Sequence, residues 1–330
     1  IYIAFGGVGC DYSRSQSFGE VFAYSASALQ SVANSYRPAP ASDGSCGGSF
    51  LDSIWMSGSG PAVDPYGNIW FTTGNGCLHY PYSLAQSLIR LSPTLTYPNN
   101  NQNYDTQMAN DAPSTNGSDL DLGSGGVSIS TVGYVVYGGK DGKTWITNDG
   151  PNTYLGGYCY NPCLQTQAYS HQQTNGGLWG SSAVFTGPDS SMWIATGGQG
   201  TAGTSGLGVW RFIGATRSGN GESLIAHTGD VLPSGGTIPF VSSNGTASGT
   251  YVVWFLKRVG SGQVYLYGYN AENLQLLTVQ NGGIWRRGRY AILAPAVADG
   301  YVMVASENRL RIWTVPGNFA GVKPSSSRHK

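Results

Sequence analysis

The chain has little charge and no long apolar run. Only 10% of its residues are charged and its formal net charge is zero, so it has neither a basic surface to attract nucleic acid nor an acidic one to concentrate cations. No stretch of about 18 apolar residues is present to span a membrane. We therefore expect neither a nucleic-acid partner nor a membrane span.

Catalytic motifs are also scarce. The glycine segments GNG at 74–76 and GGQG at 197–200 are not followed by the helix and Lys-Ser/Thr of a phosphate loop, and they are typical of turns. His79, His171 and His227 are isolated, with no Ser or Cys nucleophile motif nearby. No residue is therefore predicted to be catalytic.

Glycine and aromatic residues are abundant, with 50 Gly, 21 Tyr and 9 Trp, as in chains where many turns join β-strands. An aromatic or β-branched run recurs at intervals of 50 to 68 residues, in the segments 1–7, 69–75, 134–140, 192–198, 251–257 and 301–307. A small apolar run precedes every copy but the first, at 61–64, 126–130, 182–186, 239–243 and 295–299. A third run follows each copy, at 20–26, 87–93, 143–149, 208–214, 263–269 and 309–315.

This ordered unit predicts an all-β chain, a β-propeller of four-stranded antiparallel blades. Small residues suit the innermost strand, which faces the central channel, and bulky residues suit the middle strands between blades. Segments 22–32 and 267–278 each place Tyr, Ala and Leu at equal offsets, which predicts the hairpin of the third and fourth strands in two blades. KDGK at 140–143 predicts a tight hairpin turn.

The ring is expected to be incomplete, with about five and a half blades over residues 1–315 and a tail over 316–330. The expected boundaries are a partial first blade at 1–57 and further blades that start near 58, 123, 178, 236 and 292. The first copy begins at its second strand, so we expect upstream blades to be absent from this chain or supplied by a neighbour.

Several phrases resemble secreted propellers of the PQQ-like, quinoprotein-type superfamily: GSGPAVDPYGNIWFTTGNG, SDLDLGSGG, YGGKDGKTWITND, GGLWGSSAVF and YGYNAENLQLL. The resemblance implies a ring of about seven or eight blades in the full-length protein. Quinoprotein dehydrogenases often carry an adjacent Cys-Cys pair and tryptophan-docking repeats, and this chain has no such pair and no intact repeat. Bound PQQ is therefore not expected.

Successive turns of an up-and-down blade lie at opposite ends of its strands, so the second-to-third turns and the links between blades share one end. We expect the histidines His79 and His171 on this long-loop face, where function is usually carried. All five cysteines are expected there too, as loop disulfides with one thiol left over: Cys10, Cys46, Cys77, Cys159 and Cys163. Cys159 and Cys163 flank YNP as one candidate pair, and a metal site is the alternative.

Two further candidate sites concern oxygen ligands and positive charge. Asn116, Ser118, Asp119 and Asp121 group oxygens that suit Ca²⁺, with both carboxylates on one side of an extended strand. The alternative is that the aspartates accept backbone hydrogen bonds at a blade junction. WRRGRY at 285–290 is the one basic cluster, interpreted as a solvated loop or as an anionic-ligand or proteolysis site.

The cysteines and the acceptor sequons at Asn116 (NGS) and Asn244 (NGT) predict a secreted, extracellular glycoprotein. No signal peptide precedes Ile1, so we expect a processed form or a fragment. The expected function is a non-catalytic binding or structural scaffold without a cofactor. Its expected partners are copies of itself in an oligomer or filament, an upstream segment, or a glycan. The alternatives are a quinoprotein-type oxidoreductase that binds PQQ and calcium, or a carbohydrate-active enzyme on the long-loop face.

Overall fold

The computed structural model is all-β, with six small antiparallel sheets that follow one another along the chain. It describes residues 1–6, 18–39, 52–76, 83–97, 104–105, 118–153, 155, 169–172, 177–198, 206–214, 221–229, 232, 235–286, 293–307 and 309–315. Within these ranges the single helical segment is a 3-10 turn, η2 (Leu122–Ser124). The same ranges contain no helix with the length and hydropathy that a membrane crossing requires.

Each sheet is a meander whose strands lie side by side in chain order. Named in chain order, the sheets and their strands are A, with β1 (Tyr2–Phe5), β2 (Glu20–Ser25) and β3 (Ala28–Tyr36); B, with β4 (Ala62–Val63), β5 (Ile69–Thr72), β6 (Leu88–Leu91) and β7 (Tyr104–Asp105); C, with β8 (Val127–Ile129), β9 (Tyr134–Gly138), β10 (Lys143–Asn148) and β11 (Tyr169–Gln172); D, with β12 (Ala183–Thr186), β13 (Met192–Gly197), β14 (Leu207–Phe212) and β15 (Glu222–His227); E, with β16 (Phe240–Ser242), β17 (Val252–Val259), β18 (Gln263–Asn270) and β19 (Leu276–Ile284); and F, with β20 (Ala296–Ala298), β21 (Tyr301–Ser306) and β22 (Arg309–Thr314).

The predicted order of strands is confirmed in every sheet. The small apolar runs form the first strands, the aromatic runs form the second and the third runs form the third. The two predicted hairpins are β2–β3 and β18–β19, and each shows two shifts of register. Sheet A starts at the second-strand position, because β1 is the aromatic run and pairs with β2 alone among the described strands.

Middle strands carry the core, because they lie between neighbouring sheets. All four residues of β5 are buried, as are all six of β13. Separate apolar clusters fill the spaces between sheets: one spans sheets A to C, and three others join C to D, D to E and E to F. Bulky flat residues in the second and third strands therefore serve packing, as the sequence pattern indicates.

An aspartate in the first-to-second turn orients a tryptophan in two of the sheets. In sheet B, Asp64 accepts hydrogen bonds from the backbone N–H of Asn68 at 2.8 Å and from the indole Nε1 of Trp70 at 2.8 Å. In sheet D, Asp189 accepts a hydrogen bond from Trp193 Nε1 at 3.0 Å. The segment DPYGN is thus a turn whose aspartate satisfies both backbone and indole donors.

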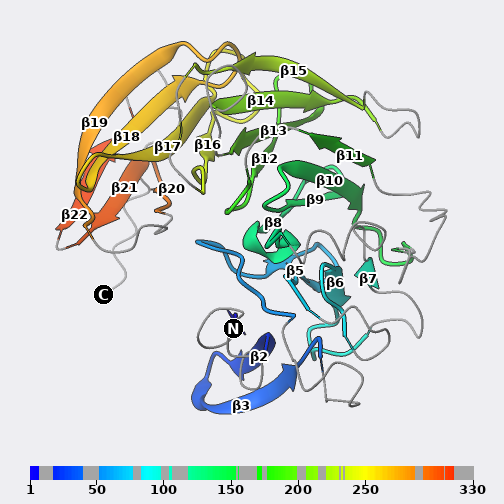
Figure 1. Ribbon diagram of the computed structural model, residues 1–330. Helices are drawn as coiled ribbons and strands as arrows, with labels where there is room; N and C mark the ends of the chain where they lie inside the picture. The colour runs from blue at the N-terminus through cyan, green and yellow to red at the C-terminus, as the bar shows by residue number, and fades with distance from the viewer. Residues whose placement is uncertain are drawn as a thin grey trace.

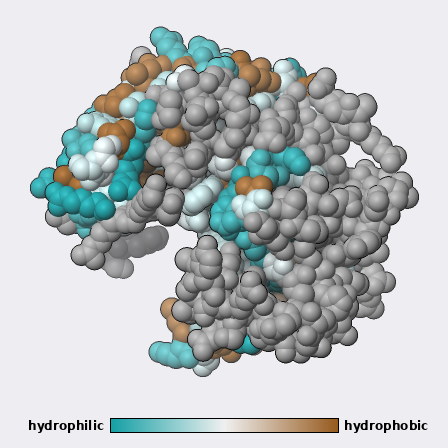
Figure 2. Space-filling model, viewed as in Figure 1, coloured by the Kyte–Doolittle hydropathy of each residue, from teal (hydrophilic) through white to brown (hydrophobic). Residues whose placement is uncertain are grey.

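The sheets are arranged along an arc around a common centre (Figure 1). First strands line the inside, where β4 contacts β8, β8 contacts β12, β12 contacts β16 and β16 contacts β20. The arc does not close: the surface is open between sheet F at one end and sheet A at the other (Figure 2). Neighbours in the chain are therefore neighbours in space, and the two end sheets each border the gap.

Candidate binding site

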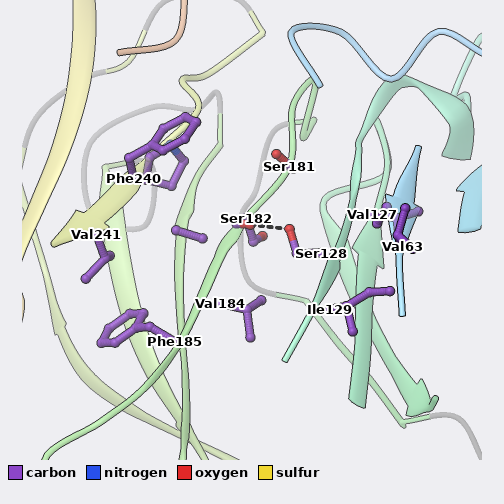
Figure 3. A pocket seen from close by; sticks show the side chains of 13 residues that line it. Val63, Val127, Ser128, Ile129, Ser181, Ser182, Val184, Phe185, Phe240 and Val241 are labelled. Atoms are coloured by element: carbon purple, nitrogen blue, oxygen red, sulfur yellow. Dashed lines mark hydrogen bonds between the residues drawn. The ribbon is translucent and has the colours of Figure 1, made fainter. Parts of the chain in front are cut away.

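The inner side of the arc holds a hollow of about 410 Å³ (Figure 3). Four first strands or the residues beside them contribute its lining: Ala62, Val63, Val127, Ser128, Ile129, Ser181, Ser182, Ala183, Val184, Phe185, Pro239, Phe240 and Val241. The predicted inner strands thus face the centre. Phe185 and Phe240 depart from the expectation that only small residues line it.

The hollow is apolar, and the hydroxyl groups of Ser128 and Ser182 are engaged by neighbours. Ser128 donates a hydrogen bond to the carbonyl oxygen of Ser182 at 2.6 Å, and Ser182 Oγ lies 2.8 Å from the hydroxyl of Thr196. Val63 is 54% exposed and Phe240 is 37% exposed, so apolar carbon faces solvent here. With no titratable side chain in its lining, the hollow suits binding of an apolar group and offers no acid or base.

At the long-loop end of sheets B and C, two carboxylates converge on one ammonium. Lys140 Nζ lies 2.6 Å from Asp121 Oδ2 and 3.1 Å from Asp119 Oδ2. Their segment is not the extended strand that the sequence predicted. Asp119 has φ of 56° within a turn and Asp121 caps η2, so a tight turn brings the carboxylates together.

Asp121 also joins the two sheets through backbone hydrogen bonds. Its Oδ1 accepts from the backbone N–H of Asn75 at 2.7 Å. Gln86 donates to Asn75 Oδ1 at 2.9 Å and accepts from the backbone N–H of Leu122 at 2.7 Å. The interpretation of a carboxylate that accepts backbone hydrogen bonds at a junction is therefore confirmed for Asp121.

The candidate calcium site includes this ion pair. Burial lowers the pKa of Lys140, but the carboxylates of Asp121 and Asp119 outweigh it and raise that pKa, so the side chain is a cation. Ser118 is exposed, Asn116 lies outside the described residues, and the described residues contain no group of three His, Cys, Asp or Glu side chains that could hold a metal. The described members thus bind a lysine ammonium and do not fit an open set of oxygen ligands.

A second carboxylate, Asp52, is completely buried near the same end of sheets A and B. Its Oδ1 accepts from Ser83 Oγ at 2.8 Å and its Oδ2 accepts from the backbone N–H of Leu84 at 2.7 Å. Burial outweighs these hydrogen bonds and raises the pKa of Asp52 to about 7. Because the pKa of this buried group is shifted in the folded chain, its titration links the stability of the fold to pH.

The other predicted site residues have mixed positions. The five cysteines and His79 lie outside the described residues. His171 lies in the outer strand β11, opposite Thr144, and not in a loop. Asn244 is exposed in the turn between β16 and β17, where its backbone N–H donates to Thr250 Oγ1 at 3.1 Å.

Asp52 and Arg90 are among the buried charged residues that sequence reasoning missed. Arg90 is 1% exposed and donates to the carbonyl oxygens of Gly150 and Thr153, at 2.9 Å each. A charged residue inside the apolar run LIRL was a signal for Arg90, whereas nothing in the sequence around Asp52 marks it as buried.

No protein-family model and no curated protein matches the chain.

Proposed function

We propose that this chain is a non-catalytic scaffold, an open β-propeller-type arc that binds a further antiparallel β-sheet across its two ends. The uncovered apolar faces of sheets A and F carry this proposal. Secretion, glycosylation at Asn116 and Asn244, and the resemblance to quinoprotein-type propellers belong to the same proposal.

Sheet A has one covered and one uncovered face. Tyr2 and Ala4 pack into the core between sheets A and B, while Ile1, Ile3 and Phe5 alternate with them and are 55%, 42% and 51% exposed. Phe5 contacts Phe22 edge to face, with centroids 5.6 Å apart, so the uncovered face is a preformed apolar surface.

Sheet F shows the mirror situation. Val302 and Val304 are fully buried against sheet E, while Leu310 and Ile312 on the other face are 62% and 55% exposed. Inside the arc, each sheet packs one face on the sheet that precedes it in the chain and the other face on the sheet that follows. The uncovered face of sheet F is the one that would pack on a following sheet, and the uncovered face of sheet A is the one that would pack on a preceding sheet. A β-sheet of the same kind therefore suits either position.

Charged chemistry is absent from the hollow, which supports binding and not catalysis. Copies of the same chain are the simplest partner, because each carries both kinds of uncovered face. A contact between unlike faces is heterologous and propagates into an oligomer or filament.

Analytical ultracentrifugation over a range of concentrations tests the proposal. We expect wild-type chain to associate and Leu310→Lys to remain monomeric with an unchanged far-UV circular dichroism spectrum. Leu276→Lys is the matched control, because Leu276 is 49% exposed in the outer strand β19, away from both end faces. A wild type that stays monomeric at high concentration would contradict self-assembly. Turnover of a sugar or alcohol that disappears when residues of the long-loop end are substituted would contradict the non-catalytic role.

A further inference from the structure

A group of N–H donors gathers where sheets E and F meet at the long-loop end. Arg258 lies near the end of β17, Trp285 and Arg286 directly follow β19, and Arg309 and Arg311 lie in β22. We call these five residues the E–F arginine cluster. The backbone holds the two sheets together here, because Glu307 N–H donates to the carbonyl oxygen of Ile284 at 3.1 Å.

Register places the arginines on facing sides of the junction. Arg258 pairs with Val264, and Val264 pairs with Gly283, so all three share the face of sheet E that packs on sheet F. Arg311 pairs with Val304, which lies on the opposing face of sheet F. A Cβ built on Gly283 would lie 3.8 Å from Arg311 Nε, so the guanidinium lies beside the sheet E backbone where a side chain is missing.

Two donors of this cluster are buried and unused. Arg311 Nε and Trp285 Nε1 have no hydrogen-bond partner among the described residues. A buried donor left unsatisfied costs about 1–3 kcal/mol, and buried donors in native proteins normally have a partner. Trp285 packs against the apolar cluster between sheets E and F, and Arg311 pairs with Val304, a member of that cluster.

Arg309 and Arg311 form no ion pair within the described residues. The nearby carboxylate of Glu307 accepts a hydrogen bond from the backbone N–H of Arg286. The other described carboxylates of these sheets, Glu272 and Asp299, lie in turns at the opposite end of the strands. Charge and unused donors therefore coincide at one place.

We propose that the E–F arginine cluster binds an oxyanion, a phosphate or sulfate group, with Arg311 and Trp285 as the buried donors and Arg309 as an outer one. A tetrahedral oxyanion supplies acceptors for several N–H groups at once, and guanidinium groups suit such recognition. This site does not depend on assembly of the arc, since it lies on the covered side of sheet F.

Titration of the full chain with inorganic phosphate and with sulfate tests the site, by thermal shift and by tryptophan fluorescence. We expect a saturable rise in Tm, and at least about tenfold weaker binding for Arg311→Gln. Arg211→Gln is the matched control, because Arg211 pairs with Asp189 in sheet D, far from the cluster. Unchanged affinity in Arg311→Gln, or an equal Tm rise with sodium chloride at the same ionic strength, would overturn the proposal.

Further arms distinguish the source of the group. Competition by glucose 6-phosphate or glucose 6-sulfate assigns the site to a group carried on a larger molecule, and binding of the inorganic ions alone assigns it to a free anion; both outcomes support an oxyanion site. Arg311→Lys keeps the charge but loses the planar fork, so we expect binding between that of wild type and Arg311→Gln. If Arg311→Gln does not fold, Arg309→Gln provides the same comparison from an exposed position.

Discussion

The junction between sheets B and C is polar at its long-loop end, whereas the junction between sheets D and E has an aromatic core. At the first, Asp121 and Gln86 accept hydrogen bonds from neighbouring backbone N–H groups, and the Asp121 carboxylate pairs with the Lys140 ammonium. At the second, the ring of Tyr251, directly before β17, lies against Phe185 and Trp193 of sheet D, with centroids 5.7 and 6.5 Å apart. Neighbouring sheets of the same architecture are thus held together by polar contacts at one junction and by aromatic contacts at another.

The difference teaches what each kind of contact requires. Stacked rings exclude water and need no partner beyond carbon, so they tolerate changes of pH and salt. Buried charges must keep their partners, because a carboxylate or ammonium left alone in the interior is strongly destabilising. The B–C junction is therefore more specific, because removing either partner of the ion pair leaves the other charge unsatisfied.

The largest effect is expected at the aromatic junction. Phe255 is fully buried, so Phe255→Ala removes a ring and leaves a cavity, and we expect a loss of about 3–5 kcal/mol in the free energy of unfolding, measured by urea denaturation. Tyr66→Ala is the control, because Tyr66 is 56% exposed, and should change stability by less than about 0.5 kcal/mol. Similar losses in the two variants would show that the D–E rings do not carry the core.

The polar junction should respond through its partners. Asp121→Ala leaves the Lys140 ammonium with one exposed carboxylate, and we expect a loss of about 3 kcal/mol. A double-mutant cycle with Lys140→Ala measures the coupling, and the double variant should lose less than the sum of the single losses. If the losses of stability add, the Asp121–Lys140 ion pair does not stabilise this junction.

Asp52 should make the stability of the fold depend on pH. Its pKa is raised to about 7 in the folded chain, so the folded state binds more protons than the unfolded state between about pH 4 and pH 7. Stability from this group is therefore full at low pH and falls as pH rises, by about 2 kcal/mol from pH 5 to pH 7.

Asp52→Asn, which resembles the protonated carboxyl, should remove this part of the slope. Urea titrations of both proteins at pH 5, 6 and 7 and constant ionic strength provide the test. Equal slopes in wild type and variant would exclude Asp52 as the titrating group.

The smallest effect is expected at the exposed turn of sheet D. Asp189→Ala removes hydrogen bonds to Ser191 and to the indole of Trp193, and we expect a loss of about 1 kcal/mol. Burial raises the pKa of Asp189, but these hydrogen bonds outweigh it and lower that pKa. The stability that Asp189 contributes is therefore present at neutral pH and is lost as the pH falls below the pKa of the unfolded chain. Acid titration of Asp189→Ala beside wild type checks the direction.

The fold was predictable because its signal is local and repeated. Each strand type recurs with its own composition, and a meander then places turns and links at fixed ends. The segment at 118–126 was harder, because a turn at Asp119 breaks the alternation that an extended strand requires. Lys140 was interpreted only as part of a hairpin turn, since its partners come from another loop.

The site residues that escaped prediction have partners far away in the sequence. Arg90 binds carbonyl oxygens 60 and 63 residues away, and Asp52 binds Ser83 and Leu84. Burial of such groups depends on how one sheet sits against the next, which composition does not specify. The basic segment after β19 was visible, but its convergence with Arg311 follows from the register of two sheets.

The open gap between sheets A and F also bears on how such a chain can evolve. Inner strands contact one another in chain order, and each unit is encoded by one continuous segment. In a closed ring the number of units is fixed by geometry, whereas an arc can gain or lose a unit by duplication or deletion while its remaining junctions persist. The number of units is then a heritable variable, and each new number sets a different angle between the two end sheets.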